Sequence, residues 1–455
     1  MKGNYVVLTT IADGVLDVAQ GIYDTGADLF GDTTIRLGVT GLARSGKTVF
    51  ITSLVANLLD QGRMPHLLAA SEGRIVAAYL QPQPDDTVPR FDYEAHLGAL
   101  PGQPPHWPDS TRAVSELRVS LKVKPNGLLA GRQGPRTIHL DIIDYPGEWL
   151  LDLALLDQSY NAWSAATLGR LENRDSAKGF RDILASIDGA ARLEEVQAKA
   201  LASSFTDYLN AARAAGYYDC TPGRFLLPGD LAGSPVLTFA PLPPGDAPRR
   251  SLRREMARRY EAYKAQVVRP FFRDHFARID RQVVLVDALG AIHNGPAAVE
   301  DMRAAMSEIL SAFRPGRNAF LSQIFRGKRV EKILFAATKA DHVHHTQHAR
   351  LTAIMEALTR DARDRARFAG SDTQALSLAA LRATTEETVQ HDGAPLDVVR
   401  GTLLDTGKQA AFYPGALPED PSHILSPAAN GAQGWLDGDY EVMRFAPAAL
   451  PLRPG

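Results

Sequence analysis

A glycine-containing segment, Gly41-Leu-Ala-Arg-Ser-Gly-Lys-Thr48, has the residue types and the spacing that bind phosphate groups. It matches the pattern GxxxxGK[ST] and lies between a strand-like apolar run and a helical pattern. The N–H groups of such a turn, with the unpaired donors at the start of the helix, bind phosphate oxygens. Lys47 is predicted to reach the β- and γ-phosphates, and Thr48 to offer its hydroxyl to Mg²⁺. The residues predicted to contact the nucleotide here are Arg44, Ser45, Gly46, Lys47, Thr48 and Val49.

A second motif, Asp144-Tyr-Pro-Gly-Glu148, follows a buried strand predicted at 137–143. An aspartate at the carboxyl end of such a strand, beside a phosphate-binding turn, can hold Mg²⁺ through a water molecule. Gly147 lets a backbone N–H turn toward the γ-phosphate, so that the following loop responds to that group. An ordinary turn is the alternative, but the position after a strand and downstream of a phosphate-binding turn favours the nucleotide role.

A third motif, Thr338-Lys-Ala-Asp341, follows another apolar strand-like run and matches the base-recognition pattern [NT]KxD. A carboxylate at Asp341 can accept hydrogen bonds from guanine N1–H and from the exocyclic 2-amino group, which adenine lacks. The aliphatic stem of Lys339 can cover one face of the base. Ala380 and Leu381, after the last predicted strand, are predicted to offer a backbone N–H to the guanine oxygen. The sequence therefore predicts GTP; an ATPase or phosphotransferase, in which Asp341 is only structural, is the alternative.

A threonine that closes over Mg²⁺ and the γ-phosphate is expected in a loop before the strand that pairs with the one ending at Asp144. Thr111 precedes the alternating strand predicted at 117–123 and is the candidate, with Ser110 as the alternative. A helix or strand cap is the other interpretation of both residues. The predicted metal-binding residues are therefore Thr48, Thr111 and Asp144.

Alternating strands and helices must position these motifs. Further strands are predicted at 283–286, 333–337 and 375–379, with a helix at 297–313, and residues 81–108 are interpreted as a long loop. The alternation favours an α/β fold with a doubly wound, mostly parallel sheet flanked by helices.

The predicted units are a nucleotide-binding core (31–148 and 281–400), a large helical insertion (149–280), an N-terminal amphipathic helix (1–30) and a C-terminal extension packed on the core (401–455). Strand-like pieces are expected in this extension at 412–413 and 440–445.

The bulk composition limits the function classes. The chain has 455 residues, 45% of them hydrophobic, and a formal net charge of −2, so it has no overall attraction to nucleic acid. One cysteine, Cys220, cannot form an intramolecular disulfide, and its isolation favours a reducing compartment. Because the sequence has no signal-peptide pattern and no run of about 18 apolar residues, the expected location is the cytoplasm. A peripheral membrane contact is left open.

Two further clusters have a chemical and a structural interpretation. His344 and His348 would share a face at spacing i, i+4 and could bind Zn²⁺ if their segment were helical. A solvated helix face is favoured, because no acidic partner has a matching spacing. The arginine-rich segment 249–281 could contact RNA, anionic lipid or an acidic partner. Local ion pairs and burial of its aromatic residues are the favoured interpretation.

The order of these motifs resembles the Ras-like GTPase class, and in more detail the chain is similar to the YcjX-like family of bacterial GTP-binding proteins, which is linked to stress responses. The residues that carry the resemblance are Gly41–Thr48, Phe91–His96, Trp107–Arg112, Asp144–Trp149, Val286–Gly290 and Thr338–Asp341. The resemblance implies a Ras-like core, GTP and GDP as ligands with Mg²⁺, and hydrolysis of GTP by a nucleotide-dependent switch. A protein partner on the helical insertion is a hypothesis, and a non-hydrolysing GTP-sensing adaptor is an alternative.

The resemblance also suggests catalytic residues. The phosphate-binding turn is similar to that of guanylate-binding proteins, in which an arginine at the place of Arg44 acts as an internal arginine finger. Such a guanidinium neutralises charge on the transferring phosphoryl group, an effect worth roughly 10³–10⁵ in rate. Glu148 stands where Ras-like enzymes carry the glutamine that orients the attacking water. The predicted catalytic residues are Arg44, Lys47, Thr111 and Glu148; an exposed arginine paired with a surface carboxylate is the alternative for Arg44.

Overall fold

The computed structural model describes residues 32–42, 44–60, 64, 67–102, 105–108, 113–125, 134–172, 174–311, 330–368, 371–425 and 440–447. The helix expected over residues 1–30 lies outside these ranges. So do Ser110 and Thr111, the candidates for the threonine that closes over Mg²⁺.

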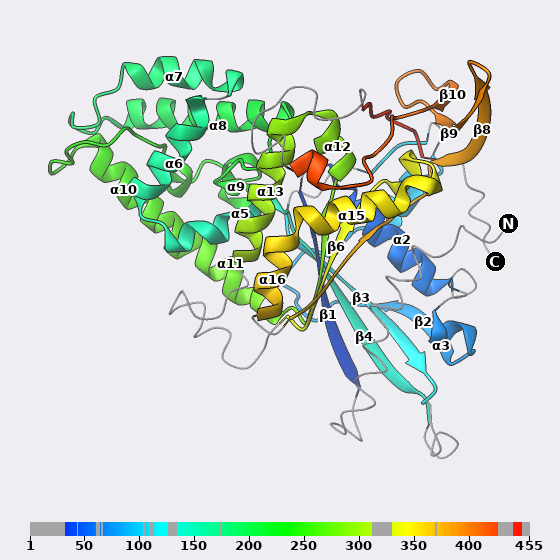
Figure 1. Ribbon diagram of the computed structural model, residues 1–455. Coiled ribbons are helices and arrows are strands. Elements are labelled where there is room, and N and C mark those ends of the chain that lie inside the picture. The colour runs from blue at the N-terminus through cyan, green and yellow to red at the C-terminus, as the bar shows by residue number, and fades with distance from the viewer. Residues whose placement is uncertain are drawn as a thin grey trace.

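In the described residues, seven strands form one sheet in the order β2-β3-β4-β1-β5-β6-β7 (Figure 1). The strands are β1 (Thr33–Gly41), β2 (Ile75–Gln81), β3 (Ser115–Val123), β4 (Arg136–Asp144), β5 (Arg281–Val286), β6 (Lys332–Ala337) and β7 (Asp372–Ser377). Strands β4, β1, β5, β6 and β7 are parallel, while β3 and β2 continue the sheet in antiparallel pairing.

Helices flank this sheet on both faces, as its alternating core residues require. The flanking helices are α2 (Lys47–Leu59), α3 (Leu68–Ser71), α4 (Tyr93–Ala99), α12 (Ala288–His293), α13 (Pro296–Ser311), α15 (His348–Leu358) and α16 (Arg360–Phe368). Successive side chains of a strand point to opposite faces. On β5, Val283 and Leu285 join the core that includes Ile51 of α2. Val284 and Val286 join the core of the other face, with residues of α12, α13 and α15. The predicted α/β fold, with a mostly parallel sheet flanked by helices, is confirmed.

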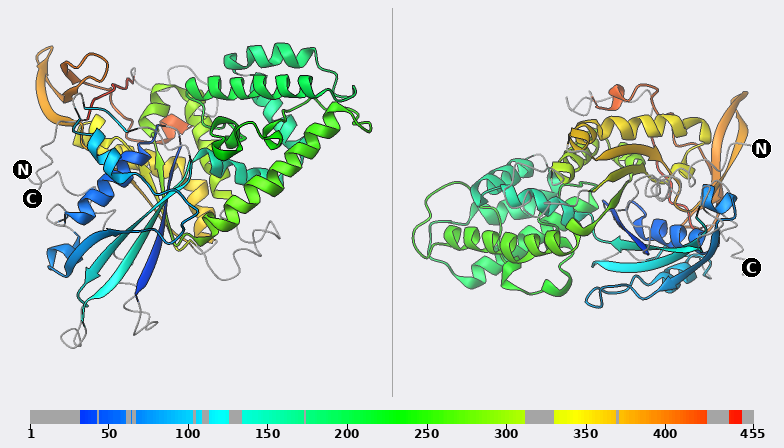
Figure 2. Two further views of the ribbon diagram at one scale, coloured as in Figure 1. Left: turned by 180° about the vertical axis from the view of Figure 1, so that it is seen from behind. Right: turned by 90° about the horizontal axis from the view of Figure 1, so that it is seen from below.

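Between β4 and β5 the chain is mainly helical, and Figures 1 and 2 show these helices gathered on one side of the sheet. They are α5 (Glu148–Leu151), α6 (Tyr160–Glu172), α7 (Lys178–Ala185), α8 (Glu195–Ala214), α9 (Gly223–Leu226), α10 (Leu252–Tyr263) and α11 (Arg269–Asp274), with a π-helical turn at Lys264–Val268. Trp163 stacks on Tyr260 with ring centroids 5.0 Å apart, and the edges of Phe205 and Phe239 meet the Trp163 ring. This aromatic core is filled from α6, α8, α10 and the loop before α10.

Many side chains of the arginine-rich segment 249–281 are buried in the protein. Tyr260, Tyr263, Phe271, Phe272 and Phe276 are buried in the same hydrophobic core. Arg259 is buried and pairs with Glu255 at 2.8 Å and with Glu195 at 2.5 Å. These contacts support local ion pairing over a partner surface.

Region 81–108 contains a helix, so the long-loop prediction was wrong there. Helix α4 begins after Asp92, whose Oδ1 accepts a hydrogen bond from the Ala95 N–H at 3.2 Å. Tyr93 is buried against the sheet core. The helix has seven residues, and the proline- and glycine-rich sequence around it masked the signal.

A second sheet follows β7 in the chain, with strands β8 (Thr384–His391), β9 (Ala394–Thr402) and β10 (Gln409–Phe412) in the order β10-β9-β8. Strand β10 ends within the piece expected at 412–413. Residues 440–445 are not a full strand: Leu403 and Phe445 form an isolated bridge, and the Ala446 N–H donates to the Thr402 carbonyl at 2.8 Å. Within the described ranges, no helix combines the length and the apolar character needed to cross a bilayer.

Candidate nucleotide site

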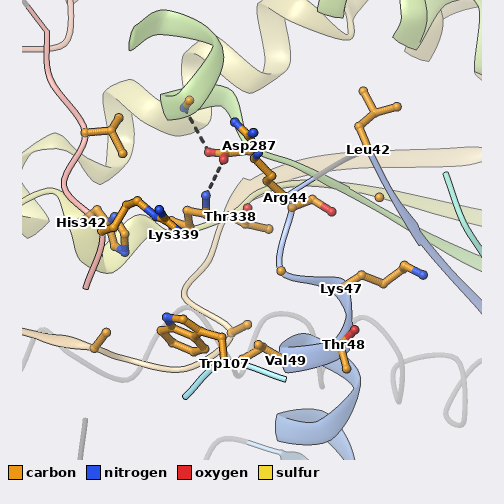
Figure 3. Close-up of a pocket in the computed structure, with 18 of the residues that line it drawn as sticks. Leu42, Arg44, Lys47, Thr48, Val49, Trp107, Asp287, Thr338, Lys339 and His342 are labelled. Carbon is orange, nitrogen blue, oxygen red and sulfur yellow. Dashed lines mark hydrogen bonds and ion pairs between the residues drawn. The ribbon is translucent and has the colours of Figure 1, made fainter. Parts of the chain in front are cut away.

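A cavity of about 660 Å³ lies at the carboxyl ends of the parallel strands, where ligands of open α/β sheets bind (Figure 3). Its lining comes mainly from the turns that follow β1, β4, β5, β6 and β7 and from residues 442–445, with Trp107, Pro108, Arg213 and Leu404 completing it. The predicted site residues that line it are Arg44, Ser45, Gly46, Lys47, Thr48, Val49, Glu148, Thr338, Lys339, Asp341, Ala380 and Leu381. Segments more than 300 residues apart in the sequence therefore line the same cavity.

The turn after β1 is tight and leads directly into α2. Gly46 has φ +74°, in the left-handed region that favours glycine, and it is the residue before the helix. Arg44 shares that conformation at φ +65°, and its side chain is exposed. A Cβ on Gly41 would lie 2.0 Å from the Ser45 Oγ, so the backbone passes too close for any side chain. Among the described residues, no side chain caps the start of α2.

Lys47 and Asp144 form a buried ion pair at this end of the cavity. The Lys47 Nζ lies 2.5 Å from the Asp144 Oδ1, and the two side chains are 10% and 1% exposed. Asp144 ends β4 beside β1, where its register partner is Val39. The carboxylate predicted for Mg²⁺ therefore lies at the expected strand end, and it contacts the lysine of the phosphate-binding turn.

Gly147 and Glu148 connect this turn to the helical region. A Cβ on Gly147 would lie 2.3 Å from the Gly41 carbonyl oxygen, so the two turns touch through backbone atoms. The buried Glu148 Oε1 lies 3.0 Å from the Nη2 of Arg213, a residue of α8 that also lines the cavity. Glu148, predicted to orient water, is therefore held by a cation from the helical region.

The far end of the cavity is built around Asp341. Its Oδ2 accepts a hydrogen bond from the Ala383 N–H at 2.7 Å, and its carbonyl accepts one from the Thr384 hydroxyl. Lys339 has φ +61°, and its Nζ pairs with Asp287, as Figure 3 shows. The Asp287 Oδ1 also accepts from the N–H of Gly290 at 3.0 Å and caps α12. The carboxylate and the lysine of the third motif are both fixed by neighbouring loops.

The histidines after Asp341 do not form the predicted helix face. His344 lies before a 3₁₀ turn and His348 is the first residue of α15, so they do not share a helical face. The His348 Nε2 lies 2.8 Å from the Ala340 carbonyl oxygen, and burial lowers the pKa of His348. The helical i, i+4 pair of His344 and His348, on which both the zinc-ligand and the solvated-face interpretations depended, is therefore not formed.

Comparison with known proteins agrees with this arrangement. The model of the YcjX-like family, DUF463, matches residues 35–454. The chain belongs to the YcjX-like family. A relative from Escherichia coli strain K12, named Ras-like GTPase YcjX, is 40% identical over 403 residues, which are 85% of this chain and 86% of the relative. A relative from Shewanella oneidensis with the same name is 36% identical over 441 residues, 91% of this chain and 89% of the relative.

The cavity of this YcjX-like protein is also lined by residues that the motif analysis did not assign. His342 lines it, and burial lowers the pKa of His342 below its usual value near 6.5. In the described part of the chain, the His342 Nδ1 is buried with no hydrogen-bond partner. Phe445 meets the His342 ring edge-on with centroids 5.2 Å apart, and its carbonyl accepts from the Trp107 Nε1–H at 2.8 Å. Asp287 and Trp107 lie in segments that carried the family resemblance; His342, Arg213 and Phe445 had no signal beyond their residue type.

Proposed function

We propose that this chain is a cytoplasmic, Mg²⁺-dependent GTPase that binds GTP in the 660 Å³ cavity and hydrolyses it to GDP and phosphate. One observation carries the proposal: the phosphate-binding turn 41–48 and the base-recognition motif 338–341 line the same cavity. Both follow parallel strands of one sheet, as a Ras-like P-loop core requires. The names of the relatives, Ras-like GTPase YcjX, support the same activity.

In this proposal the chain has four parts. The Ras-like core comprises 31–148 and 281–400, the helical insertion 149–280, and the C-terminal extension 401–455, which packs on the core. The fourth part, residues 1–30, lies outside the described ranges. The Trp107–Phe445 hydrogen bond and the edge-on contact of Phe445 with His342 support the packing of the extension on the core.

The residues of the cavity fit a guanine nucleotide. A Cβ on Gly147 would clash with the Gly41 carbonyl oxygen, and a Cβ on Gly41 would clash with the Ser45 Oγ, so both positions need glycine and leave backbone to face the phosphates. At the other end, the buried His342 Nδ1 lacks a partner among the described residues, and a ligand could supply one. Thr48, Asp144 and Thr111 would hold Mg²⁺, which would neutralise charge on the phosphate oxygens when bound.

Catalysis would follow from positioning and charge. The N–H groups of residues 44–49 hold the phosphates, and the Lys47 ammonium exchanges the Asp144 carboxylate for phosphate oxygens. Arg44, exposed on the turn, moves onto the transferring phosphoryl group as an internal arginine finger. The Gly147 N–H binds the γ-phosphate, and Glu148 contributes to the placement of the attacking water. The Glu148 carboxylate also pairs with Arg213 of the helical insertion.

Base selection is assigned to the other end. The Asp341 carboxylate accepts from guanine N1–H and the 2-amino group, and the Lys339 stem covers one face of the base. A backbone N–H of Ala380 or Leu381 donates to the guanine oxygen. Both residues line the cavity in the loop that precedes Ala383, the donor to Asp341.

The helical insertion would report the nucleotide state through the Glu148–Arg213 ion pair. Glu148 follows the γ-phosphate sensor Gly147, and Arg213 lies near the end of the long helix α8. A change at the phosphate would therefore move or release α8. A protein partner that reads this change on the insertion, and a role in a bacterial stress response, are the working hypotheses. Hydrogen exchange of α8 should differ between GDP and a non-hydrolysable GTP analogue in the wild type, and the difference should vanish in Arg213→Ala. Equal exchange in the wild type would end this part of the proposal.

The whole proposal is tested by thermal unfolding and by phosphate release. GDP with Mg²⁺ should raise the melting temperature at concentrations where ADP does not, since a ligand at 100 times its Kd adds about 2.7 kcal/mol of stability. An equal shift with ADP would favour an ATPase or phosphotransferase. Single-turnover phosphate release from bound GTP distinguishes a GTPase from an adaptor that senses GTP without hydrolysis.

A further inference from the structure

A second group of metal-ligand side chains lies where the segment before α15 meets the small sheet. His344 and His345 come from that segment and Glu386 from β8, and one ligand atom of each lies within 4.8 Å of the others. None of the three lines the nucleotide cavity. The GTPase proposal gives them no role, so this group needs its own explanation.

Glu386 is oriented toward the histidines by two contacts. Its Oε2 lies 2.9 Å from the Nδ1 of His345, and its Oε1 accepts from the His345 backbone N–H at 3.1 Å. The His344 ring is buried, and its centroid is 4.3 Å from that of the His345 ring. The three side chains thus converge on one point, with the His345 and Glu386 side chains 53% and 14% exposed.

A second carboxylate adjoins them. The Oδ2 of Asp397 lies 3.5 Å from the His344 Nδ1, and its Oδ1 accepts from the Thr388 hydroxyl at 2.8 Å. Asp397 on β9 is the register partner of Thr388 on β8, two residues after Glu386. Because residues two apart on a strand share a face, Glu386 and Asp397 lie on the same side of the small sheet.

We propose that His344, His345, Glu386 and Asp397 bind one divalent transition-metal ion of the zinc class. Two imidazoles with two carboxylates are a zinc ligand set, with bonds of about 2.0–2.2 Å. Tetrahedral ligands at that distance are roughly 3.4 Å apart, so the ligand atoms of His344, His345 and Glu386, now within 4.8 Å of one another, must close by up to about 1.4 Å, and Asp397 must move in from its place beside His344. Ca²⁺ and Mg²⁺ prefer oxygen ligands alone and suit this group less well. The Thr388 hydroxyl and the His345 N–H supply the outer hydrogen bonds that orient ligating carboxylates.

The position of this site gives it a structural consequence. Thr384 and Ala383 already bind the backbone and the carboxylate of Asp341. The metal would join the same two chain segments a second time, three residues after Asp341 and two after Thr384. It would hold together the loops that fix the Asp341 carboxylate.

The test uses the full chain without a histidine tag, freed of metal by chelator and titrated with ZnCl₂ by calorimetry. One ion should bind per chain, and Co²⁺ in its place should give the visible absorption of a tetrahedral site. His345→Ala and Glu386→Gln should each weaken zinc binding about 10–100-fold. His391→Ala is the matched control, an exposed histidine at the far end of β8, and it should leave the affinity unchanged.

Zinc binding of wild-type strength in both His345→Ala and Glu386→Gln would overturn the site, as would the lack of one-to-one binding by the wild type. A loss in the His391→Ala control as large as in His345→Ala would also overturn it. The GDP-induced rise in melting temperature is measured on the same samples and reports the nucleotide site. A failure of one proposal is thereby distinguished from a failure of the other.

Discussion

Two lysine–aspartate ion pairs stand at the two ends of the cavity, and they differ in what holds them. Lys47 pairs with Asp144 in a buried contact, with the lysine 10% exposed and the aspartate 1% exposed. Lys339 pairs with Asp287 in a more open one, with exposures of 29% and 6%. Asp287 also caps α12 through the Gly290 N–H.

The difference indicates two uses of the same chemistry. At the phosphate end, the Lys47 ammonium faces the carboxylate proposed for Mg²⁺, so a ligand with its own negative charge can take over the lysine. At the base end, Asp287 at the start of α12 holds the Lys339 ammonium in place, and the aliphatic stem of Lys339 is proposed to cover one face of the base. Lys47 can therefore exchange its carboxylate partner for a phosphate, whereas Lys339 keeps its partner Asp287 when nucleotide binds. The four predictions that follow test this contrast, beginning with the largest effect.

Arg44→Ala should affect chemistry more than binding, because Arg44 is proposed to contact the phosphates in the transition state. Single-turnover GTP hydrolysis should slow roughly 10³-fold or more, while the Kd for GDP stays within about threefold. Rapid-quench or phosphate-sensor kinetics at saturating GTP measure this. An unchanged rate would remove the arginine finger, and a parallel loss of GDP affinity would give Arg44 a plain binding role.

Lys47→Ala should weaken GDP binding roughly 100-fold, because a charged donor to phosphate is lost. Lys339→Ala is the matched change at the base end and should cost only about threefold to tenfold, since it removes a wall and no phosphate contact. Calorimetric titration with GDP and Mg²⁺ gives both values, and circular dichroism checks that each variant is folded. Equal losses in the two variants would contradict the contrast between the two lysines.

Asp341→Asn should change the choice of base with little change in fold. The asparagine oxygen can still accept from the Ala383 N–H, so the loop remains anchored. GDP affinity should fall roughly 50-fold because the carboxylate no longer accepts two donors of guanine, and xanthosine diphosphate should bind more tightly than to the wild type. Competition titrations with the two diphosphates measure the exchange. If both affinities fell equally, Asp341 would be a structural residue.

Asp287→Asn should have the smallest effect. It removes the charge that holds Lys339 but keeps an acceptor for the Gly290 N–H, so α12 stays capped. GDP affinity should fall about threefold to fivefold, with guanine still preferred, because only the position of the lysine stem is loosened. A loss as great as that of Lys47→Ala would show that Asp287 contacts the ligand itself.

The parts of the molecule that the sequence predicted correctly are those specified by local pattern. Strands β5 and β6 carry the continuous apolar runs 283–286 and 333–337 because these runs are largely buried on both faces of the sheet, and the alternation of β3 reflects its place near the sheet edge. The local conformations of the contiguous motifs 41–48 and 338–341 depend mainly on residues that are neighbours in the sequence. Helix α4 was missed because its signal is one cap and seven residues among prolines and glycines.

Contacts between distant residues could not be predicted in the same way. Arg213 reaches Glu148 across 65 residues, and Trp107 binds Phe445 across 338, with no pattern to pair them. The histidines illustrate the limit most clearly. Helical spacing suggested His344 with His348, whereas tertiary structure pairs His345 with Glu386, 41 residues away.

The placement of Phe445 bears on how the protein is made. The cavity wall at the base end is completed by residues 442–445, which leave the ribosome hundreds of residues after the phosphate-binding turn. A nascent chain can fold that turn long before its pocket is whole. Nucleotide can therefore act as a full folding aid only after residues 442–445 have been synthesised, and a chain stalled earlier would present an open, weakly binding cleft.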